Sequence, residues 1–427
     1  MEITQLEKKI NRYLNEKIPE EVNKALKFQD PKAKETCKAV IQQFFSENQI
    51  SIPGSSLDQS VKLIYENTIG YGPIDVFIEH AVERAITEIK VRGQREIYTK
   101  EWGCWKAHPE IQFRSIEHLN NIVNRILASS DKPLTESQPF VDNAELPNGS
   151  RVTMVRSPLT RSGIIMNIRI YTAGLFEAEA LLKRGALTPE QHEIIKFLMR
   201  ARMNTIFVGG TDTGKTTLMG AHLVYHNKDT HIVTIEDANE LQLHTRHKDL
   251  NVSDLFIKKN EFMSINHTDL FYLSLRMSPD LYVFNEIRNP PETAVWCSAA
   301  ISGHYGCSTS LHAEDEKAGM SRLEGNLREN DTTLTVELAR EKICQAVDAF
   351  IVVKRDEDGT RYCSSIVEPI YDPEHQRVYY HTIISRPHYS LPGTFKGFSS
   401  SLLDLAERRN SISKDQITDW KSKGGIA

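Results

Sequence analysis

The chain has 427 residues, of which 40% are apolar and 26% charged, and its formal net charge is −5. This length predicts two or three domains, and this balance is ordinary for a globular protein. The acidic total argues against a nucleic-acid-binding protein. No stretch reaches the roughly 20 apolar residues that span a bilayer, and the charged N-terminus lacks the apolar core of a secretion signal. We therefore expect a cytoplasmic protein.

The first part of the chain, residues 1–68, is predicted to be a helical N-terminal extension. Apolar side chains recur at spacings of three and four in 6–14 and 39–45. This spacing is typical of helices with one buried face. A segment rich in Pro, Gly and Ser at 51–56 interrupts the pattern, and a helix resumes at 57–67.

Residues 69–172 are predicted to form an α+β N-terminal domain. Apolar and polar residues alternate in its first half, as in strands of a sheet with one solvated face. Strands are expected at 86–91, 95–98 and 164–170, a helix at 116–128, and a turn at Asn148-Gly149 before another strand. A linker at 173–186 then leads into the last domain.

Residues 187–427 are predicted to form an α/β domain with a parallel-sheet core. Thr188 and Gln191 can form a capping box for its first helix, and Pro189 suits the first helical position. Strands are expected at 204–208, 231–235, 281–284 and 307–311, helices at 216–225, 269–277 and 293–302, and β-like segments at 365–372 and 377–385 before a polar helix. Alternating strands and helices indicate a parallel sheet covered on both faces, which binds its ligands at the C-terminal strand ends.

A phosphate-binding motif, G-x-x-x-x-G-K-[ST], follows the first of these strands. Its glycines let successive backbone N–H groups point at phosphate oxygens, and the following helix offers its positive end to the same anion. Lys215 adds a charge toward the β- and γ-phosphates, and the Thr216 hydroxyl can ligate Mg²⁺. The predicted nucleotide-binding residues are Gly209, Gly210, Thr211, Asp212, Thr213, Gly214, Lys215, Thr216 and Thr217.

Two further strand ends carry carboxylates. Glu236 and Asp237 follow the strand at 231–235, and taken alone this pair favours a helix N-cap over a catalytic role. Glu286 ends an apolar strand in the Walker B pattern, where one carboxylate can polarise the attacking water and contact Mg²⁺ through water. The alternative interpretation of Glu286 is a charged residue at a strand end that pairs with Arg288.

A histidine, His312, ends the strand at 307–311 behind a glycine-framed turn. It can hydrogen-bond the γ-phosphate, although a lone histidine is more commonly a satisfied core residue. His312 could also ligate zinc together with Cys297, His304 and Cys307, but no C-x-x-C pair anchors such a site.

Taken together, these motifs resemble those of the secretion ATPase superfamily of type II and type IV secretion, pilus assembly and conjugation. That family carries a Walker A loop, an acidic box T-I-E-D-x-x-E-L, a Walker B box and a histidine box, in this order. All four occur here, at 209–217, 234–241, 279–288 and 303–313. Segments 70–74, 87–89 and 139–152 resemble the branch that drives tight-adherence pili, near the type IV secretion ATPases. The lack of a C-x-x-C module argues against the type II branch.

The resemblance implies a RecA-like C-terminal domain that hydrolyses ATP with Mg²⁺ and a homohexameric ring. It implies roles for Glu286 as catalytic base, Glu236 as support for metal and water, and His312 as phosphate sensor. Arg151 and Arg169 lie where the family's N-terminal domain supplies arginines to the nucleotide. The implied partners are inner-membrane platform or secretion-channel proteins, which would hold the chain peripherally at the cytoplasmic face of the inner membrane, without direct nucleic-acid binding.

The chain departs from the family pattern at Asp212 and Asn285, where glycine is usual, and at Thr213, where serine is usual. A carboxylate beside the phosphates is electrostatically adverse unless it points away. Two alternatives to a motor stay open. One is a RecA-type ATPase stimulated by nucleic acid, against which the acidic composition counts. The other, motivated by Asp212 and Asn285, is a nucleotide-gated assembly scaffold with little turnover.

Overall fold

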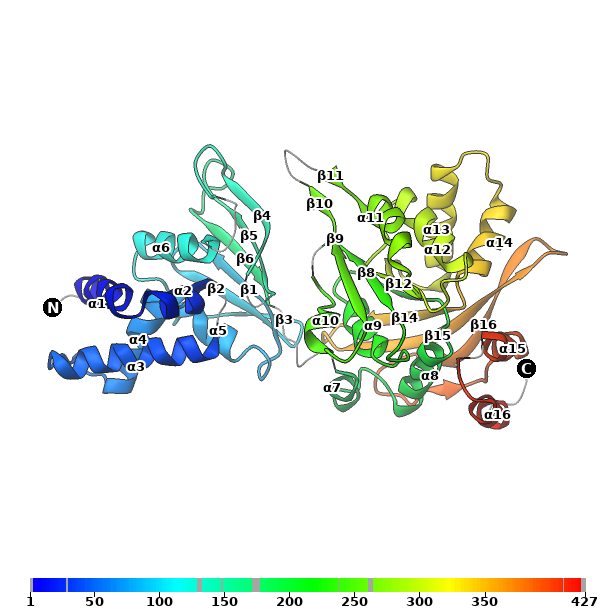
Figure 1. Ribbon diagram of the computed structural model, residues 1–427, viewed down its shortest axis with the longest axis horizontal. Coiled ribbons are helices and arrows are strands. Elements are labelled where there is room, and N and C mark those ends of the chain that lie inside the picture. The colour runs from blue at the N-terminus through cyan, green and yellow to red at the C-terminus, as the bar shows by residue number, and fades with distance from the viewer. Residues whose placement is uncertain are drawn as a thin grey trace. The chain divides into compact units, whose positions relative to one another are not determined.

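The computed structural model describes residues 3–27, 30–128, 133–146, 149–170, 177–237, 239–259, 264–409 and 411–423. The chain divides into two compact units, residues 1–172 and 173–427 (Figure 1). Within the described ranges, no helix combines the length and the apolar character that a membrane span requires.

The N-terminal unit begins with helices, as predicted. They are α1 (Ile3–Lys17), α2 (Pro19–Lys27), α3 (Pro31–Glu47) and α4 (Leu57–Thr68). Their apolar stripes, which include Leu6, Ile10 and Ile41, pack into a core of their own. Asp30 caps α3, and Ser56 and Gln59 form a capping box at α4, so the local sequence fixes where these helices start.

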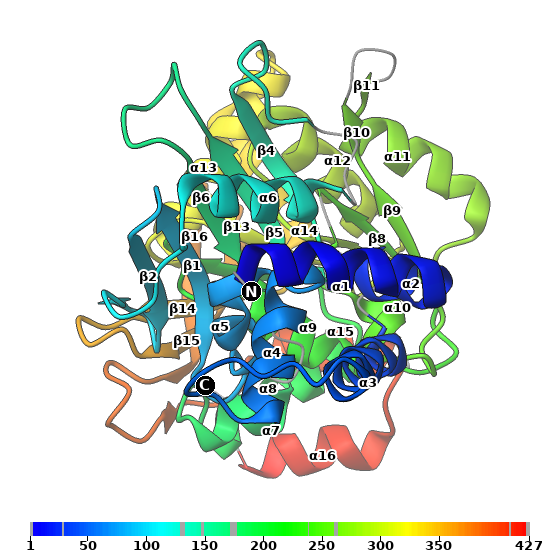
Figure 2. The ribbon, with the colours of Figure 1, turned by 90° about the vertical axis from the view of Figure 1, so that its left-hand side faces the viewer.

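The rest of this unit is an antiparallel sheet with helices packed on it, which confirms the α+β prediction. Within the described residues its strand order is β3-β2-β1-β6-β5-β4. The strands are β1 (Ile86–Arg92), β2 (Glu96–Glu101), β3 (Cys104–Ala107), β4 (Phe140–Glu145), β5 (Arg151–Val155) and β6 (Ile165–Arg169); the short helices are η1 (Gly72–Ile74) and α5 (Asp75–Glu79). Helix α6 (Ile116–Leu127) lies over the sheet, and its apolar side chains share a core with the strands (Figure 2). Asn148 of the predicted turn lies outside the described residues.

The C-terminal unit is built on a larger sheet with the order β17-β16-β15-β14-β7-β13-β12-β8-β9 in the described chain. Its strands are β7 (Thr205–Gly209), β8 (Ile232–Glu236), β9 (Val252–Phe256), β12 (Leu281–Phe284), β13 (Ser308–His312), β14 (Ala349–Arg355), β15 (Arg361–Asp372), β16 (Arg377–Ser385) and β17 (Thr394–Phe395). The run from β14 to β9 is parallel, and β15, β16 and β17 continue it antiparallel. The predicted parallel core is confirmed.

Helices cover both faces of this sheet. One face carries α7 (Ala178–Lys183), α8 (Pro189–Arg200), α9 (Lys215–Leu223), α10 (Leu243–Arg246), α15 (Ser400–Arg409) and α16 (Lys414–Lys423); the other carries α11 (His267–Ser274), η3 (Leu275–Met277), α12 (Pro290–Ile301), α13 (Glu316–Asn330) and α14 (Val336–Ala346). The buried strand β7 contributes side chains to the hydrophobic cores on both faces of the sheet, because Phe207 points to one face while Ile206 and Val208 point to the other. The phosphate-loop strand therefore lies at the centre of the unit.

Some elements were not predicted from the sequence. Strand β9 and the short hairpin of β10 (Lys258–Lys259) and β11 (Ser264–Ile265) lie in the segment 249–264, which matched no family pattern. Strand β14 was also missed, although it pairs directly with β7. Helix α7 lies in the predicted linker 173–186, of which residues 173–176 are outside the described chain. The predicted four-part division stays a prediction.

A buried ion pair joins α15 to the start of β7. Arg409 Nη1 lies 2.6 Å from Asp348 Oδ2 and donates to the backbone oxygen of Arg202 at 2.7 Å. The same Asp348 oxygen accepts from the backbone N–H of Asn204 at 2.6 Å. Burial raises the pKa of Asp348, and the guanidinium opposes that shift. The pair therefore fixes the chain where it enters the phosphate-loop strand.

We expect Arg409→Gln to lower the free energy of unfolding of the C-terminal unit by about 3–5 kcal/mol, because Asp348 would stay buried without its counter-ion. Urea denaturation followed by circular dichroism measures the loss. The double variant with Asp348→Asn should lose less than the two single losses combined, because no unpaired charge then remains buried. A loss below about 1 kcal/mol in Arg409→Gln, as for an exposed pair, would contradict this account.

Candidate active site

The phosphate loop joins the buried end of β7 to the N-terminus of α9. Gly214, the N-cap of α9, has φ +92°, a left-handed conformation that favours glycine. At Gly209 a Cβ atom would lie 2.4 Å from the backbone oxygen of Val353, so a side chain there would displace the loop from β14. Thr216 and Thr217 begin the first turn of α9. The two motif glycines are therefore required for different reasons: Gly214 by its backbone conformation, and Gly209 by the close approach of β14.

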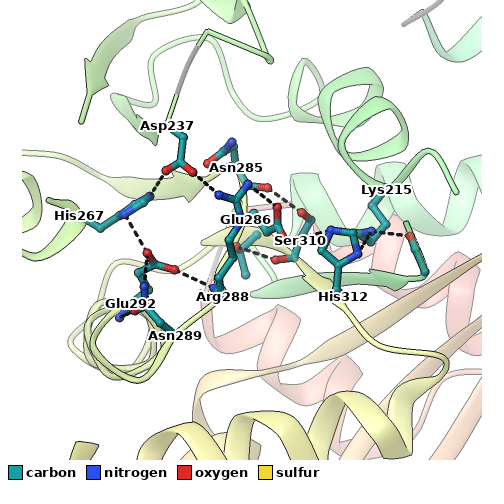
Figure 3. Close-up of polar contacts among 12 residues, drawn as sticks. Lys215, Asp237, His267, Asn285, Glu286, Arg288, Asn289, Glu292, Ser310 and His312 are labelled. Carbon is teal, nitrogen blue, oxygen red and sulfur yellow. Dashed lines mark hydrogen bonds and ion pairs between the residues drawn. The ribbon is translucent and has the colours of Figure 1, made fainter. Parts of the chain in front are cut away.

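Lys215 connects the loop to the end of β13. Its side chain is buried, with 6% of its surface exposed, and its Nζ donates to the backbone oxygen of Gly210 at 2.8 Å. The same Nζ lies 3.1 Å from Nδ1 of His312 (Figure 3). A cavity of about 530 Å³ opens beside these groups and is lined by Gly210, Thr213 and His312, among others. The phosphate loop and His312 thus border one cavity, and Lys215 contacts both Gly210 and His312 of its lining, which suits a phosphate group.

Glu286 follows β12 and lies beside His312. Glu286 Oε1 is 3.0 Å from His312 Nε2, and Oε2 accepts from Arg288 Nη2 at 2.8 Å. Burial by itself would raise the pKa of Glu286, but the hydrogen bonds from His312 and Arg288 outweigh it and lower the pKa to about 2. The structure therefore joins Lys215, His312 and Glu286 in one continuous chain of contacts.

A second set of charges continues from Arg288. Arg288 Nη1 donates to Asp237, and Asp237 Oδ1 lies 3.1 Å from Nε2 of His267. His267 Nδ1 lies 3.2 Å from Oε1 of Glu292, and the other oxygen of Glu292 accepts from the backbone N–H of Arg288 at 2.7 Å. These contacts close a ring around Arg288 (Figure 3). His267 was not predicted as a site residue, because it lies at the start of α11 and outside every motif.

His267 is held as an imidazolium between two carboxylates. Burial alone would lower its pKa, but the contacts with Asp237 and Glu292 outweigh burial and raise it to about 9. The pKa values of both carboxyls are lowered in return, against the effect of burial. Its ring also stacks on Phe284, the last residue of β12, with centroids 5.9 Å apart. His267 therefore supports the segment that presents Glu286.

We expect His267→Gln to remove about 2–4 kcal/mol of stability near pH 6.5. The sign follows from the raised pKa: the contribution is complete below the unfolded value of 6.5 and is lost as the pH rises through about 9. Unfolding midpoints of both proteins from pH 6 to 10 measure it, and the two curves should converge at the alkaline end. Exposed His244 on α10 provides the control variant His244→Gln. Parallel curves for wild type and His267→Gln would contradict the account.

Glu236 has different surroundings from Glu286. It is fully buried, and its Oε2 accepts from the backbone N–H groups of Glu240 at 2.9 Å and Leu241 at 3.0 Å. Burial raises its pKa to about 8. The structure does not join Glu236 to the Glu286 network; its neighbour Asp237 enters that network instead. The catalytic role of Glu236 stays a prediction, whereas its contacts fix the turn after β8.

The remaining predicted site residues divide between the two units. Arg151 and Arg169 face each other across β5 and β6 in the N-terminal unit, and their approach to nucleotide stays a prediction. Asn285, just before Glu286, is buried, and its backbone oxygen accepts from the Ser310 hydroxyl at 2.7 Å. This bond ties the Walker B segment to β13. The asparagine at the usual glycine position thus lies directly after β12 and stays in contact with β13.

A family profile described as type II/IV secretion system protein matches residues 74–361. This span contains the phosphate loop, Glu286 and His312 in their observed arrangement. The chain belongs to this family. Its members include ATP-hydrolysing motors. The phosphate-loop and Walker B motifs and the α/β fold of this chain are consistent with that membership. This secretion-family chain is accordingly an ATPase that uses nucleotide as its substrate.

Curated relatives support the same assignment. The type IV secretion system protein VirB11 of Brucella abortus is 30% identical over 322 residues, which cover 68% of this chain and 87% of that protein. A Mycobacterium tuberculosis protein named for conjugal transfer is 27% identical over 290 residues, covering 66% of this chain and 80% of its own length. The family member described here is thus similar to proteins of both secretion and conjugation.

Solved structures show the same fold. The pilus retraction motor PilT with bound ADP is 17% identical, has a TM-score of 0.52, and is covered over 89% of its length by 82% of this chain. The ATPase DotB of Legionella pneumophila is 15% identical, has a TM-score of 0.50, and is covered over 86% of its length by 82% of this chain. The predicted RecA-like architecture with a preceding α+β domain is confirmed.

Proposed function

We propose that this ATPase is a Mg²⁺-dependent motor that drives pilus assembly or the transfer of protein or DNA through a secretion or conjugation machine. The observation that carries the proposal is the chain of contacts from Lys215 through His312 to Glu286, in which His312 also lines the cavity beside the phosphate loop. Phosphoryl transfer needs positioning and charge neutralisation, which these three groups supply together.

The donor set suits Mg²⁺ with ATP. Thr216 offers a hydroxyl oxygen and Glu286 a carboxylate oxygen, and hard oxygen ligands are those that Mg²⁺ prefers. Bound Mg²⁺ would neutralise charge on the β- and γ-phosphates. Thr216 would hold it directly, and Glu286 would contact it through water.

The protein side chains then have distinct roles. Lys215 and the loop N–H groups bind the phosphates, and His312 contacts the γ-phosphate. A bound phosphate would accept from the Lys215 ammonium, whereas His312 keeps its contact with Glu286 through Nε2. Glu286 then orients the attacking water and accepts its proton. Glu236 supports the metal and water, and Arg151 and Arg169 reach the nucleotide from the N-terminal unit.

We further propose that the motor is a cytoplasmic homohexamer that binds inner-membrane platform or secretion-channel proteins and attaches peripherally to the membrane through them. Support comes from family membership and from relatives named for type IV secretion and conjugal transfer. Direct nucleic-acid binding is not expected from the net charge of −5.

Light scattering of the full chain with saturating Mg²⁺ and a non-hydrolysable ATP analogue tests this proposal. The expected mass is that of six copies. A mass that stays at one copy when calorimetry shows the analogue bound would contradict the ring. Addition of single-stranded DNA should leave ATP turnover unchanged, and a strong stimulation would favour a nucleic-acid-dependent ATPase instead.

A further inference from the structure

Asp212 occupies a strained position in the phosphate loop. Its backbone has φ +61°, in the left-handed region that favours glycine. Aspartate is among the residues that tolerate this conformation best. The residue therefore needs support from its surroundings, and it also brings a negative charge to a loop that binds anions.

Two arginines supply that support. Arg361 Nη2 donates to Asp212 Oδ1 at 2.6 Å, and Arg355 Nη1 donates to Oδ2 at 3.3 Å. Arg361 Nε also donates to the backbone oxygen of Asp212 at 2.8 Å. Arg361 thus contacts both the carboxylate and the backbone of the residue in the strained conformation, using the fixed fork of its guanidinium.

The arginines flank the turn between β14 and β15, because Arg355 ends β14 and Arg361 begins β15. Strand β14 pairs in parallel with β7, and Val352 lies opposite Val208, one residue before the loop begins. Arg361 also passes close to Gly214, because a Cβ atom at that glycine would lie 3.4 Å from Arg361 Cδ. The turn therefore holds the loop near two of its left-handed residues.

We propose that Asp212 and Arg361 form a positioning pair that fixes the phosphate loop in its nucleotide-binding shape, with Arg355 as a second counter-ion. The inference rests on the proposed function, because it assumes that the loop binds the phosphates of ATP. It also gives Asp212 a role in this chain: the carboxylate is directed onto two cations, which offset the repulsion expected between it and a phosphate.

The expected effect is on affinity more than on turnover. Asp212, Arg355 and Arg361 have side chains that are 26%, 32% and 28% exposed, so water screens their attraction. We expect Arg361→Gln to raise the KM for ATP roughly three- to tenfold, as for a modest loss of binding energy, and to lower kcat far less. Arg361→Lys keeps the charge but loses the fork, and should recover only part of the affinity.

A double-mutant cycle separates this pair from a general loss of stability. Asp212→Gly removes the carboxylate and relieves the strain, while the backbone oxygen of residue 212 still accepts from Arg361. The effect of Arg361→Gln on KM should therefore be smaller in the Asp212→Gly protein than in the wild type. Arg340→Gln is the matched control, because Arg340 forms a similar pair with Glu324 at 2.9 Å between α14 and α13.

The experiment measures KM and kcat for ATP, and calorimetric affinity for a non-hydrolysable ATP analogue, on the full chain. A rise in KM with Arg361→Gln, absent with Arg340→Gln and reduced in the Asp212→Gly background, supports the pair. Unchanged affinity in Arg361→Gln, or an equal effect of Arg361→Gln in the wild-type and Asp212→Gly proteins, overturns the pair. The proposed function is unaffected by that result as long as the wild type binds the analogue. Failure of the wild type to bind the analogue would instead overturn the proposed function.

Discussion

Replacing Glu286 with glutamine is expected to lower kcat for ATP hydrolysis by about 10²–10⁴-fold, the usual contribution of a positioned general base. Glutamine keeps the shape of the side chain and can still meet His312 and Arg288, but it cannot accept the proton of the attacking water. Affinity for ATP should change little, because the phosphates are held by the loop and Lys215. Steady-state hydrolysis and calorimetry with ATP measure the two effects separately.

Glu314→Gln is the matched control for this variant. Glu314 lines the cavity that His312 borders, but it is exposed and has no proposed part in the reaction. Its variant should retain kcat close to that of the wild type. Equal losses in both variants would show that charge in the cavity matters, and not the position of Glu286; full activity in Glu286→Gln would remove its catalytic role.

Replacing Lys215 with glutamine is expected to weaken ATP binding by about 10²-fold, because it removes a buried charge that pairs with a phosphate. The ammonium group donates to Gly210 and contacts His312, so the loop itself holds it close to the position where a phosphate would bind. Calorimetric titration with an ATP analogue measures the loss. Thermal unfolding of the same variant checks that the loop still folds.

Lys354→Gln provides the comparison for Lys215. Lys354 lines the cavity beside the phosphate loop with an exposed side chain, and it therefore tests whether any nearby positive charge suffices. Its variant should bind nucleotide nearly as the wild type does. A comparable loss in both variants would indicate a diffuse electrostatic effect and would contradict the specific role of Lys215.

The sequence was sufficient to place the phosphate loop, Glu286 and His312, because each follows a short apolar strand and parallel strands bring their C-terminal ends to one edge. Local side-chain chemistry also sets where the helices capped by Thr188 and Ser56 begin, and the cap at Thr188 was predicted. Strand β14 was missed, although it begins with a buried apolar run like those of β7 and β12.

Other parts of the site depend on distant pairing that sequence spacing does not reveal. His267 and Glu292 lie on α11 and α12, and only the fold places the histidine between Asp237 and Glu292. The surroundings of Asp212 are set by Arg361, which is 149 residues away in the chain. Glu236 and Asp237 are adjacent in sequence, yet one binds backbone N–H groups and the other contacts Arg288.

We propose that a single site built on Lys215, His312 and Glu286 turns over ATP with Mg²⁺. Steady-state ATP hydrolysis by the purified full chain, with Mg²⁺ and after its chelation, tests this most directly. We predict turnover that falls to background when Mg²⁺ is chelated. Absence of turnover with Mg²⁺ present, under conditions where calorimetry shows ATP bound, would contradict the motor and favour a nucleotide-gated scaffold.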